Sequence, residues 1–217
     1  MCGRFTLRTP QNLLVEHFML DEAPDWSPRY NIAPTQEALV IRAVEGRRVA
    51  APLRWGLIPS WSKDAKTGAS MINARAETVA EKPAFLTAFK QRRCLVPADG
   101  YYEWQRAGKV KLPHLYQIRR GEPFAFAGLW ERWQGLETFT VLTTSANELA
   151  AQVHDRMPVV LSPLDSACWL DPSSDPAELV RLLEPFPADE MSDTPVSTYV
   201  NNARNEGHAC VDCTNSL

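Results

Sequence analysis

Four strand-like segments in the middle of the chain constrain its fold more than any other feature of the sequence. They are joined by short connections that contain glycine, and they are CLVPADGYYEW (94–104), KLPHLYQIRR (111–120), PFAFAGLWERW (123–133) and ETFTVLTTSA (137–146). Strands that follow one another through such short links pair as neighbours in a meander. The four segments therefore predict an antiparallel sheet or barrel.

Helical patterns are found on both sides of this region. Apolar residues recur at helical spacing over residues 10–20, where Thr9 is the expected N-cap and Pro10 belongs to the first turn. Further segments have the patterns of short helices or of a late strand: helices at 81–92, 147–153, 163–170 and 176–184, and a strand at 195–201.

A hairpin is expected before the meander, because the β-rich runs 38–44 and 47–58 are separated by Glu45-Gly46. Strands and helices do not alternate, and no linker divides the chain. We therefore expect one α+β domain over residues 1–217, with a mostly antiparallel, barrel-like core and peripheral short helices. The last residues, 208–217, are expected to be loosely held.

Composition excludes several classes of protein. No stretch approaches the roughly 18 uninterrupted apolar residues of a membrane span, and no apolar run follows the N-terminal arginines at 4 and 8. We expect a cytoplasmic protein without a secretory signal. The cysteines are odd in number and irregularly spaced, which favours free thiols over a disulfide framework. They are Cys2, Cys94, Cys168, Cys210 and Cys213.

The charge is unevenly distributed along the chain. The formal net charge is -3, which gives no general reason to expect nucleic-acid binding. Residues 165–193, however, hold eight acids and one base, so the remainder has 22 bases against 18 acids and a net charge of +4. Phosphate binding by that remainder is permitted, and DNA is expected to avoid the acidic segment.

Cys2 is the most unusual candidate for chemistry, because initiator methionine is generally removed when the next side chain is small. Loss of Met1 would leave an α-amine beside a thiol. An α-amine has an ordinary pKa of about 7.7–8.0, so part of it is unprotonated near neutral pH. With an aldehyde it forms an imine, on which the sulfur closes to a thiazolidine. The same pair could instead serve an N-terminal-nucleophile hydrolase.

Six motifs occur together and in order between residue 1 and about residue 160: MCGRF (1–5), RYNIAP (29–34), WGLIPSW (55–61), INARAET (72–78), ADGYYEW (98–104) and HDRMP (154–158). In combination they resemble the SRAP family, the SOS-response-associated peptidases. The resemblance implies an abasic-site shield in DNA repair and the SOS response: processed Cys2 captures the ring-opened aldehyde of an abasic site in single-stranded DNA as a thiazolidine. It also implies a β-rich fold with a positively charged DNA channel, and peptidase-like removal of Met1.

The resemblance assigns three further catalytic roles. Asn73 in INARAET positions Cys2, and Glu103 in YYEW accepts a proton from the α-amine. His154 in HDRMP protonates the leaving oxygen of the sugar. From the residues alone, Asn73 could equally be a capping residue, Glu103 a surface residue at a strand end and His154 a structural histidine. The same imine would favour β-elimination, so a weak lyase activity is expected.

Other residues are candidates for DNA binding. Three arginines each lie two residues from a proposed catalytic group, and the resemblance implies that they hold phosphates: Arg4, Arg75 and Arg156. Four residues are candidates for stacking on bases or wedging the strand: Phe5, Pro34, Trp61 and Trp104. The expected partner is single-stranded DNA that contains abasic sites, bound by a monomer.

Two alternatives remain open at this point. One is a cysteine peptidase or amidohydrolase acting on protein, with Cys2 as nucleophile and His154 as base. The other is a non-catalytic nucleic-acid-binding module in which the cysteine only packs. No metal or organic cofactor is expected, since His208, Cys210 and Cys213 are too few ligands for a zinc site.

Overall fold

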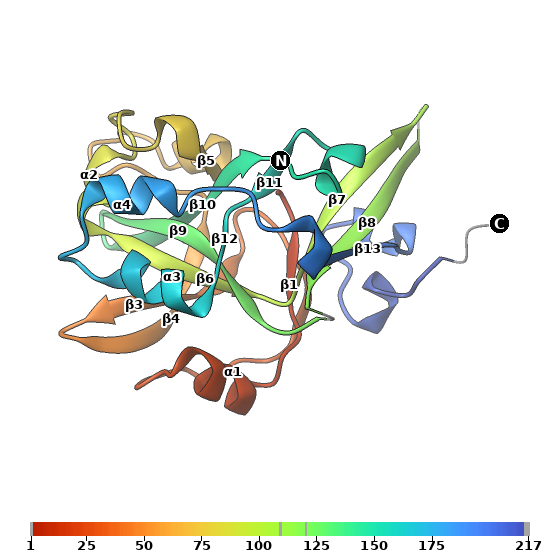
Figure 1. The fold of residues 1–217 in the computed structure, drawn as a ribbon, viewed down its shortest axis with the longest axis horizontal. Helices are drawn as coiled ribbons and strands as arrows, with labels where there is room; N and C mark the ends of the chain where they lie inside the picture. The colour runs from red at the N-terminus through yellow and green to blue at the C-terminus, as the bar shows by residue number, and fades with distance from the viewer. Residues whose placement is uncertain (1, 109, 120, 215–217) are drawn as a thin grey trace.

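Two β-sheets form the core of the residues that the computed structural model describes, which are 2–108, 110–119 and 121–214 (Figure 1). Five strands of the larger sheet pair in a closed ring: β3 (Glu37–Val44), β4 (Arg47–Trp55), β6 (Arg93–Ala98), β9 (Phe124–Trp133) and β10 (Leu136–Ser145). The ring closes because β10 pairs antiparallel with β9 and parallel with β4. The expected α+β fold with a mostly antiparallel, barrel-like core is confirmed.

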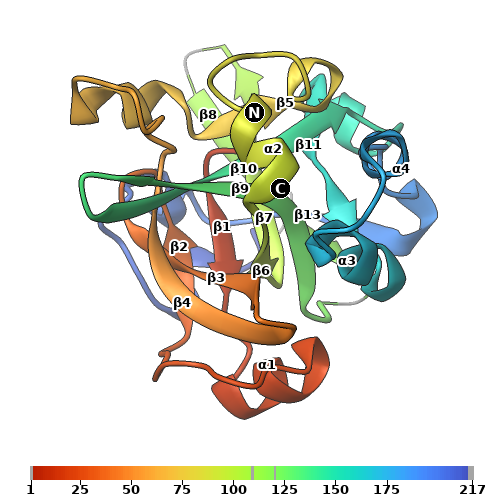
Figure 2. The same ribbon diagram turned by 90° about the vertical axis from the view of Figure 1, so that its left-hand side faces the viewer.

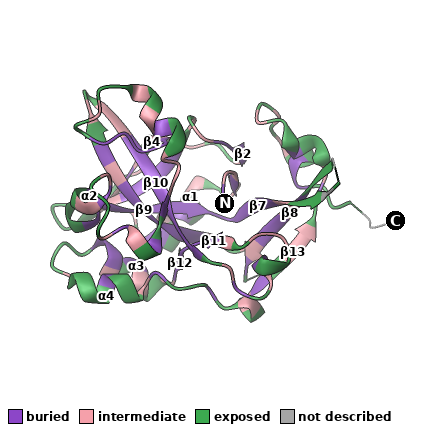
Figure 3. Cartoon of the chain, turned by 90° about the horizontal axis from the view of Figure 1, so that it is seen from above, coloured by how far each residue is buried: buried purple, intermediate pink, exposed green. Residues whose placement is uncertain are grey.

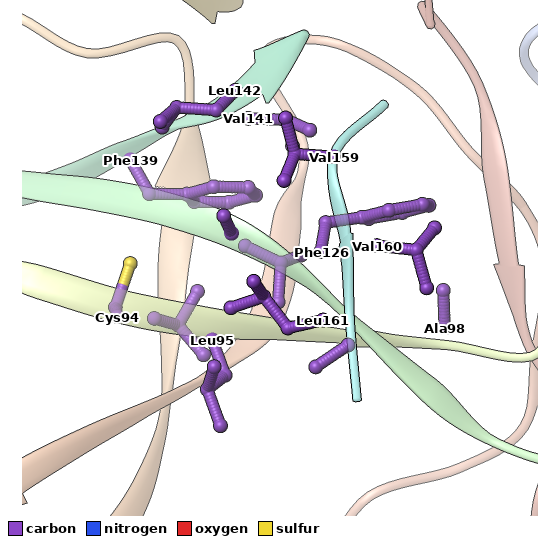
Figure 4. Packing of buried hydrophobic residues seen from close by; sticks show 14 of the residues in the cluster. Cys94, Leu95, Ala98, Phe126, Phe139, Val141, Leu142, Val159, Val160 and Leu161 are labelled. Carbon is purple, nitrogen blue, oxygen red and sulfur yellow. The ribbon is translucent and has the colours of Figure 1, made fainter. Parts of the chain in front are cut away.

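The barrel is filled by apolar side chains from neighbouring strands. Figure 4 shows Cys94 and Leu95 of β6 near Phe126 of β9 and Phe139 of β10. Gly128 lets these strands approach, because a Cβ there would lie 2.9 Å from the Cys94 sulfur. Three short strands extend the sheet: β5 (Asn73–Arg75) and β11 (Arg156–Pro158) pair with β10, and β12 (Val160–Leu161) pairs with β9.

The hairpin of β3 and β4 forms as expected. Its two turn residues, Glu45 and Gly46, have φ values of 50° and 78°, and Val44 pairs with Arg47. Two successive residues with positive φ make the type of two-residue turn that matches the twist of the strands. Figure 2 shows this hairpin away from β5 and β11.

The smaller sheet has the order β13-β8-β7-β1-β2. Its strands are β1 (Phe5–Leu7), β2 (Arg29–Ile32), β7 (Gly100–Ala107), β8 (Val110–Ile118) and β13 (Met191–Pro195). β7 and β8 form a long hairpin whose outer end projects from the body of the molecule (Figures 1 and 3). We call this hairpin, residues 100–118, the arm.

The segment 94–104 is two strands in different sheets, and the expectation of one continuous strand was wrong. The break is at Asp99, whose buried carboxylate accepts hydrogen bonds from Thr6, Arg8 and Thr9. Both Thr9 donors, the backbone N–H and Oγ1, contact Asp99 at 2.7 and 2.9 Å. Thr9 is therefore not the N-cap of the first helix, which is Pro10.

Of the four α-helices among the described residues, one spans the predicted residues 163–170 and the other three are shorter than predicted. They are α1 (Gln11–Phe18), α2 (Leu86–Gln91), α3 (Pro163–Leu170) and α4 (Pro176–Arg181), with 3-10 turns η1 (Ala65–Ser70), η2 (Ala76–Thr78), η3 (Ala150–Gln152), η4 (Ala188–Glu190), η5 (Thr198–Asn201) and η6 (His208–Cys210). α2 begins late because Pro83 disfavours helical geometry at the residue before it. The expected helix at 147–153 is only the turn η3. No helix among the described residues is long and apolar enough to cross a membrane.

The C-terminal segment differs from expectation in two ways. The late strand β13 ends at Pro195, and η5 follows it, because the Ser197 side chain accepts from the N–H of Tyr199. The residues after 207 were expected to be loosely held, yet Cys210 is fully buried in a small apolar cluster with Tyr102 and Val200. Residues 215–217 of the expected tail lie outside the described residues.

Candidate active site

Cys2 lies just before β1 and is fully buried. Its carbonyl oxygen accepts a hydrogen bond of 2.8 Å from Nδ2 of Asn73, the first residue of β5. Asn73 is held by the parallel pairing of β5 with β10, in which it lies opposite Val141. Its other amide atom, Oδ1, is buried and has no hydrogen-bond partner among the described residues. A buried hydrogen-bond acceptor is thus available on the residue that holds Cys2.

Glu103 on β7 is 5% exposed. Burial raises the pKa of its carboxyl group, and the nearby positive charge of His154 opposes that rise. The pKa of the Cys2 thiol is raised as well, first by burial and second by the negative charge of Glu103, while a hydrogen bond from the Arg4 backbone opposes the rise. Cys2, Asn73 and Glu103 therefore meet at one place, although they lie on three different segments.

His154 lies on the turn between η3 and β11. Its Nδ1 is 2.8 Å from Oδ1 of Asp155 and 3.0 Å from the backbone nitrogen of Arg156. The two contacts suit different states of the ring, because Nδ1 accepts from the Arg156 N–H when unprotonated and donates to Asp155 when protonated. Asp155, which was not among the predicted site residues, thus contacts His154.

A pocket of about 590 Å³ joins Glu103 and His154. Its lining is Glu103, Trp104, Gln105, Arg106, Lys111, Gln152, Val153 and His154. Cys2 and Asn73 are not part of this lining. Sequence reasoning missed Arg106 and Lys111, which lie opposite each other across the arm. The signal for them in the sequence is the group of three bases around Gly108, at positions 106, 109 and 111.

The three arginines proposed as phosphate clamps occupy different environments. Arg4 points inward: its guanidinium donates to Oδ1 of Asn31 at 2.6 Å and to the carbonyl of Val200 at 2.9 Å, and it lies 5.5 Å from the Trp104 ring. Burial lowers the pKa of Arg4. Arg4 is half-buried, and one terminal nitrogen of its guanidinium is engaged by Asn31 and Val200, so it supports the fold of the site.

Arg75 and Arg156 differ in the same respect. Arg75 is exposed, whereas the Arg156 side chain is 13% exposed and donates through both terminal nitrogens to the carboxylate of Glu77. Arg156 also donates to the carbonyl of Thr143 at 2.6 Å. Arg75 therefore presents its charge to solvent, whereas Arg156 is paired with Glu77.

The candidates for stacking on bases also differ in exposure. Phe5 is fully buried, with its ring 5.2 Å from that of Trp55, so it packs in the core and cannot stack on a base. Trp61 is 65% exposed, as a stacking surface requires. Trp104 is half-buried and donates from Nε1 to Asn201 at 2.6 Å. Pro34 is also half-buried.

No cluster of three or more metal-ligating side chains is found within residues 2–108, 110–119 and 121–214. Cys210 is buried in the core cluster, Cys213 is exposed, and the His208 ring contacts Asp212 at 2.9 Å. The three residues considered as a metal fragment thus have separate surroundings.

The family model described as "SOS response associated peptidase (SRAP)" matches residues 1–203. This chain belongs to the SRAP family. Among SRAP relatives, abasic site processing protein YoqW of Bacillus subtilis is 42% identical over 98% of this chain and 99% of its own length. YedK of Escherichia coli, also named an abasic site processing protein, is 32% identical over 95% of this chain and 97% of its own length.

Solved structures have the same fold. A protein from Bacteroides thetaiotaomicron superposes with a TM-score of 0.88 at 24% identity, over 99% of this chain and 100% of that chain. A phage-related protein from Bordetella bronchiseptica superposes with a TM-score of 0.74 at 29% identity, again over 99% and 100% of the two chains. The two-sheet fold is therefore shared with both of these solved structures.

Proposed function

We propose that this SRAP protein processes abasic sites in single-stranded DNA by covalent capture through Cys2. One observation carries the proposal: Asn73 holds the backbone of Cys2 beside buried Glu103, and His154 lies on the wall of the adjoining pocket. The names of the bacterial relatives support an abasic site as the lesion. Removal of Met1, which the chemistry requires, concerns a residue outside the described part of the chain.

The reaction combines one amine, one thiol and one aldehyde. The α-amine of processed Cys2 attacks the C1′ aldehyde of the ring-opened sugar and gives a carbinolamine, which loses water to form an imine. The thiol then adds across the carbon–nitrogen double bond: sulfur bonds to carbon, and its proton goes to nitrogen. The product is a thiazolidine, and only water has been released.

Each neighbouring residue has a task in these steps. Glu103, as carboxylate, accepts the proton that the attacking ammonium loses. His154 donates a proton to the departing hydroxyl, and Asn73 fixes the direction of the amine through the Cys2 carbonyl and its available Oδ1. Abstraction of the 2′ proton from the imine by the same base would cause β-elimination, which is a weak lyase activity.

The buried thiol favours this chemistry over hydrolysis of protein. A cysteine peptidase attacks with a thiolate, which needs a depressed pKa in an electropositive environment. Burial and the charge of Glu103 instead raise the pKa of the Cys2 thiol. Capture through the amine, with a neutral thiol closing the ring afterwards, fits these surroundings.

The pocket beside Glu103 offers a path for the flanking strand. Arg106 and Lys111 supply positive charge on one wall, and Trp104 supplies an aromatic face. Trp61 offers an exposed ring, and Arg75 an exposed charge near Asn73. Phosphate contacts of this kind give affinity without reading sequence.

The test is the intact mass of the purified protein before and after mixing with an oligonucleotide that contains one abasic site. We expect loss of Met1 and a denaturation-resistant adduct that requires both Cys2 and the lesion, so Cys2→Ala and undamaged DNA give none. A protein without Met1 that forms no adduct would overturn the proposal, and turnover of peptides without DNA would support the peptidase alternative.

A further inference from the structure

Arg156 and Glu77 form a bidentate ion pair near the candidate site. Glu77 lies on η2, directly after the strand that carries Asn73, and Arg156 begins β11, two residues after His154. Both terminal nitrogens of the guanidinium contact the carboxylate, one of them at 2.9 Å. The pKa of Glu77 is lowered, first by this hydrogen bonding and also by the charge of Arg75.

Glu77 is placed so that it shields the Arg156 guanidinium from a phosphate. The Glu77 side chain is 52% exposed and the Arg156 side chain 13% exposed, so the acid lies on the solvent side of the arginine. A guanidinium that already holds a carboxylate through two hydrogen bonds presents no fork to a phosphate. DNA that contacts Arg156 must first displace Glu77.

We propose that Glu77 determines specificity for the lesion by neutralising Arg156 against undamaged DNA. Non-specific affinity for single-stranded DNA depends mainly on the number of phosphates that bases on the protein neutralise. When Arg156 is paired with Glu77, the protein neutralises one phosphate fewer, and binding to every intact strand is weaker. Capture of an aldehyde through Cys2 does not depend on a phosphate contact of Arg156, so binding of the lesion is favoured relative to binding of intact DNA. The inference rests on the proposed function for the identity of the lesion.

The decisive variant is Glu77→Gln, which keeps the shape of the side chain and removes its charge. Binding of an undamaged oligonucleotide is measured over a series of salt concentrations. We expect the slope of log affinity against log salt to steepen by about 0.7, the value for one added phosphate contact on a single strand. The corresponding gain in affinity is about fivefold at 0.1 M salt.

Two controls distinguish the neutralisation of Arg156 by Glu77 from a general effect of charge. Glu22→Gln removes an acid from the exposed pair with Arg47, whose atoms are 2.8 Å apart, at the hairpin of β3 and β4. That hairpin lies away from β5 and β11 (Figures 1 and 2), so equal net charge should bring no gain there. Adding Arg156→Gln to Glu77→Gln should return the slope to the parental value.

The outcomes decide the question in both directions. An unchanged slope for Glu77→Gln, or the same change in slope for Glu22→Gln, would overturn the proposal that Glu77 neutralises Arg156. So would weaker binding by Glu77→Gln, which would make Glu77 a support that presents Arg156 to DNA. The measurement uses undamaged DNA, so its result is separate from the absence of an adduct with abasic DNA, which would contradict the proposed function alone. Melting temperatures of all variants establish that each is folded.

Discussion

At the scale of single residues, Glu103 combines a chemical role with a cost in stability. Burial raises the pKa of the Glu103 carboxyl group above its ordinary value. At a pH between the pKa of the unfolded chain and that of the folded protein, the folded state therefore binds a proton that the unfolded chain has lost. Folding is favoured below this window and loses stability as the pH rises through it. The carboxylate form that the proposed reaction needs is therefore the less stable form in the folded protein.

Glu103→Gln should accordingly stabilise the protein and abolish capture. We expect a melting temperature at pH 7 higher by roughly 2–4 °C, the shift that about 1 kcal/mol produces in a domain of this size. The gain should shrink as the pH falls to 4, where the parental carboxyl is protonated. The exposed Glu148→Gln is the control and should leave melting unchanged. A variant that melts below the parent at pH 7 would refute this reading of burial.

At the scale of elements, the break between β6 and β7 connects the barrel to the sheet that carries Glu103. Asp99 is 2% exposed and accepts hydrogen bonds from Thr6 of β1 and from Arg8 and Thr9, which follow that strand. One side chain thus fixes the N-terminal segment to the turn before Glu103. A continuous strand through this position would leave those donors buried without acceptors.

Asp99→Ala should lower the free energy of unfolding by about 3 kcal/mol, because several buried donors lose a charged acceptor together. Chemical denaturation with urea measures this loss. The matched control is Asp21→Ala, an exposed aspartate that accepts one hydrogen bond of 2.7 Å from the Arg48 N–H. Equal losses in the two variants would show that the break at 99 has no special energetic weight.

The arm is the second element with a separate prediction. Changing Arg106 and Lys111 together to Gln should weaken binding of single-stranded DNA and reduce the salt slope by about 1.4, at roughly 0.7 for each phosphate contact. The control pair is Lys90→Gln with Arg132→Gln, which removes two exposed bases from the barrel side. If both pairs of substitutions reduce the slope equally, the DNA does not follow the arm.

At the scale of the whole molecule, the C-terminal segment is hydrogen-bonded to residues that support the site. Buried Asn31 donates to the carbonyls of Asn202 and Asn205 at 3.0 and 2.8 Å, and it accepts from Arg4 at 2.6 Å. Arg4 in turn lies over Trp104 in the pocket wall. Residues far beyond the strongest motifs are thereby joined to the site.

Asn31→Ala should release this segment before the barrel unfolds. Hydrogen exchange of residues 196–214 should accelerate at least tenfold, which corresponds to about 1.4 kcal/mol, while the barrel strands keep their protection. Asn202→Ala, at an exposed position in the same segment, should change little. Uniform acceleration across the chain would instead make Asn31 a general stability residue.

The sequence by itself determined the hairpin at 45–46 and the presence of strands in the middle of the chain, because turn chemistry and strand patterns act over a few residues. The expected meander was wrong in one respect, since β8 and β9 follow each other in the chain but lie in different sheets. It also determined the family, through motifs that keep their order. What it could not determine is the direction of side chains whose partners are distant. Asn73 meets Cys2 across 71 positions, and Arg156 meets Glu77 across 79. Only the tertiary pairing of the strands brought these groups together, and it buried Phe5 in the core and engaged Arg4 with Asn31.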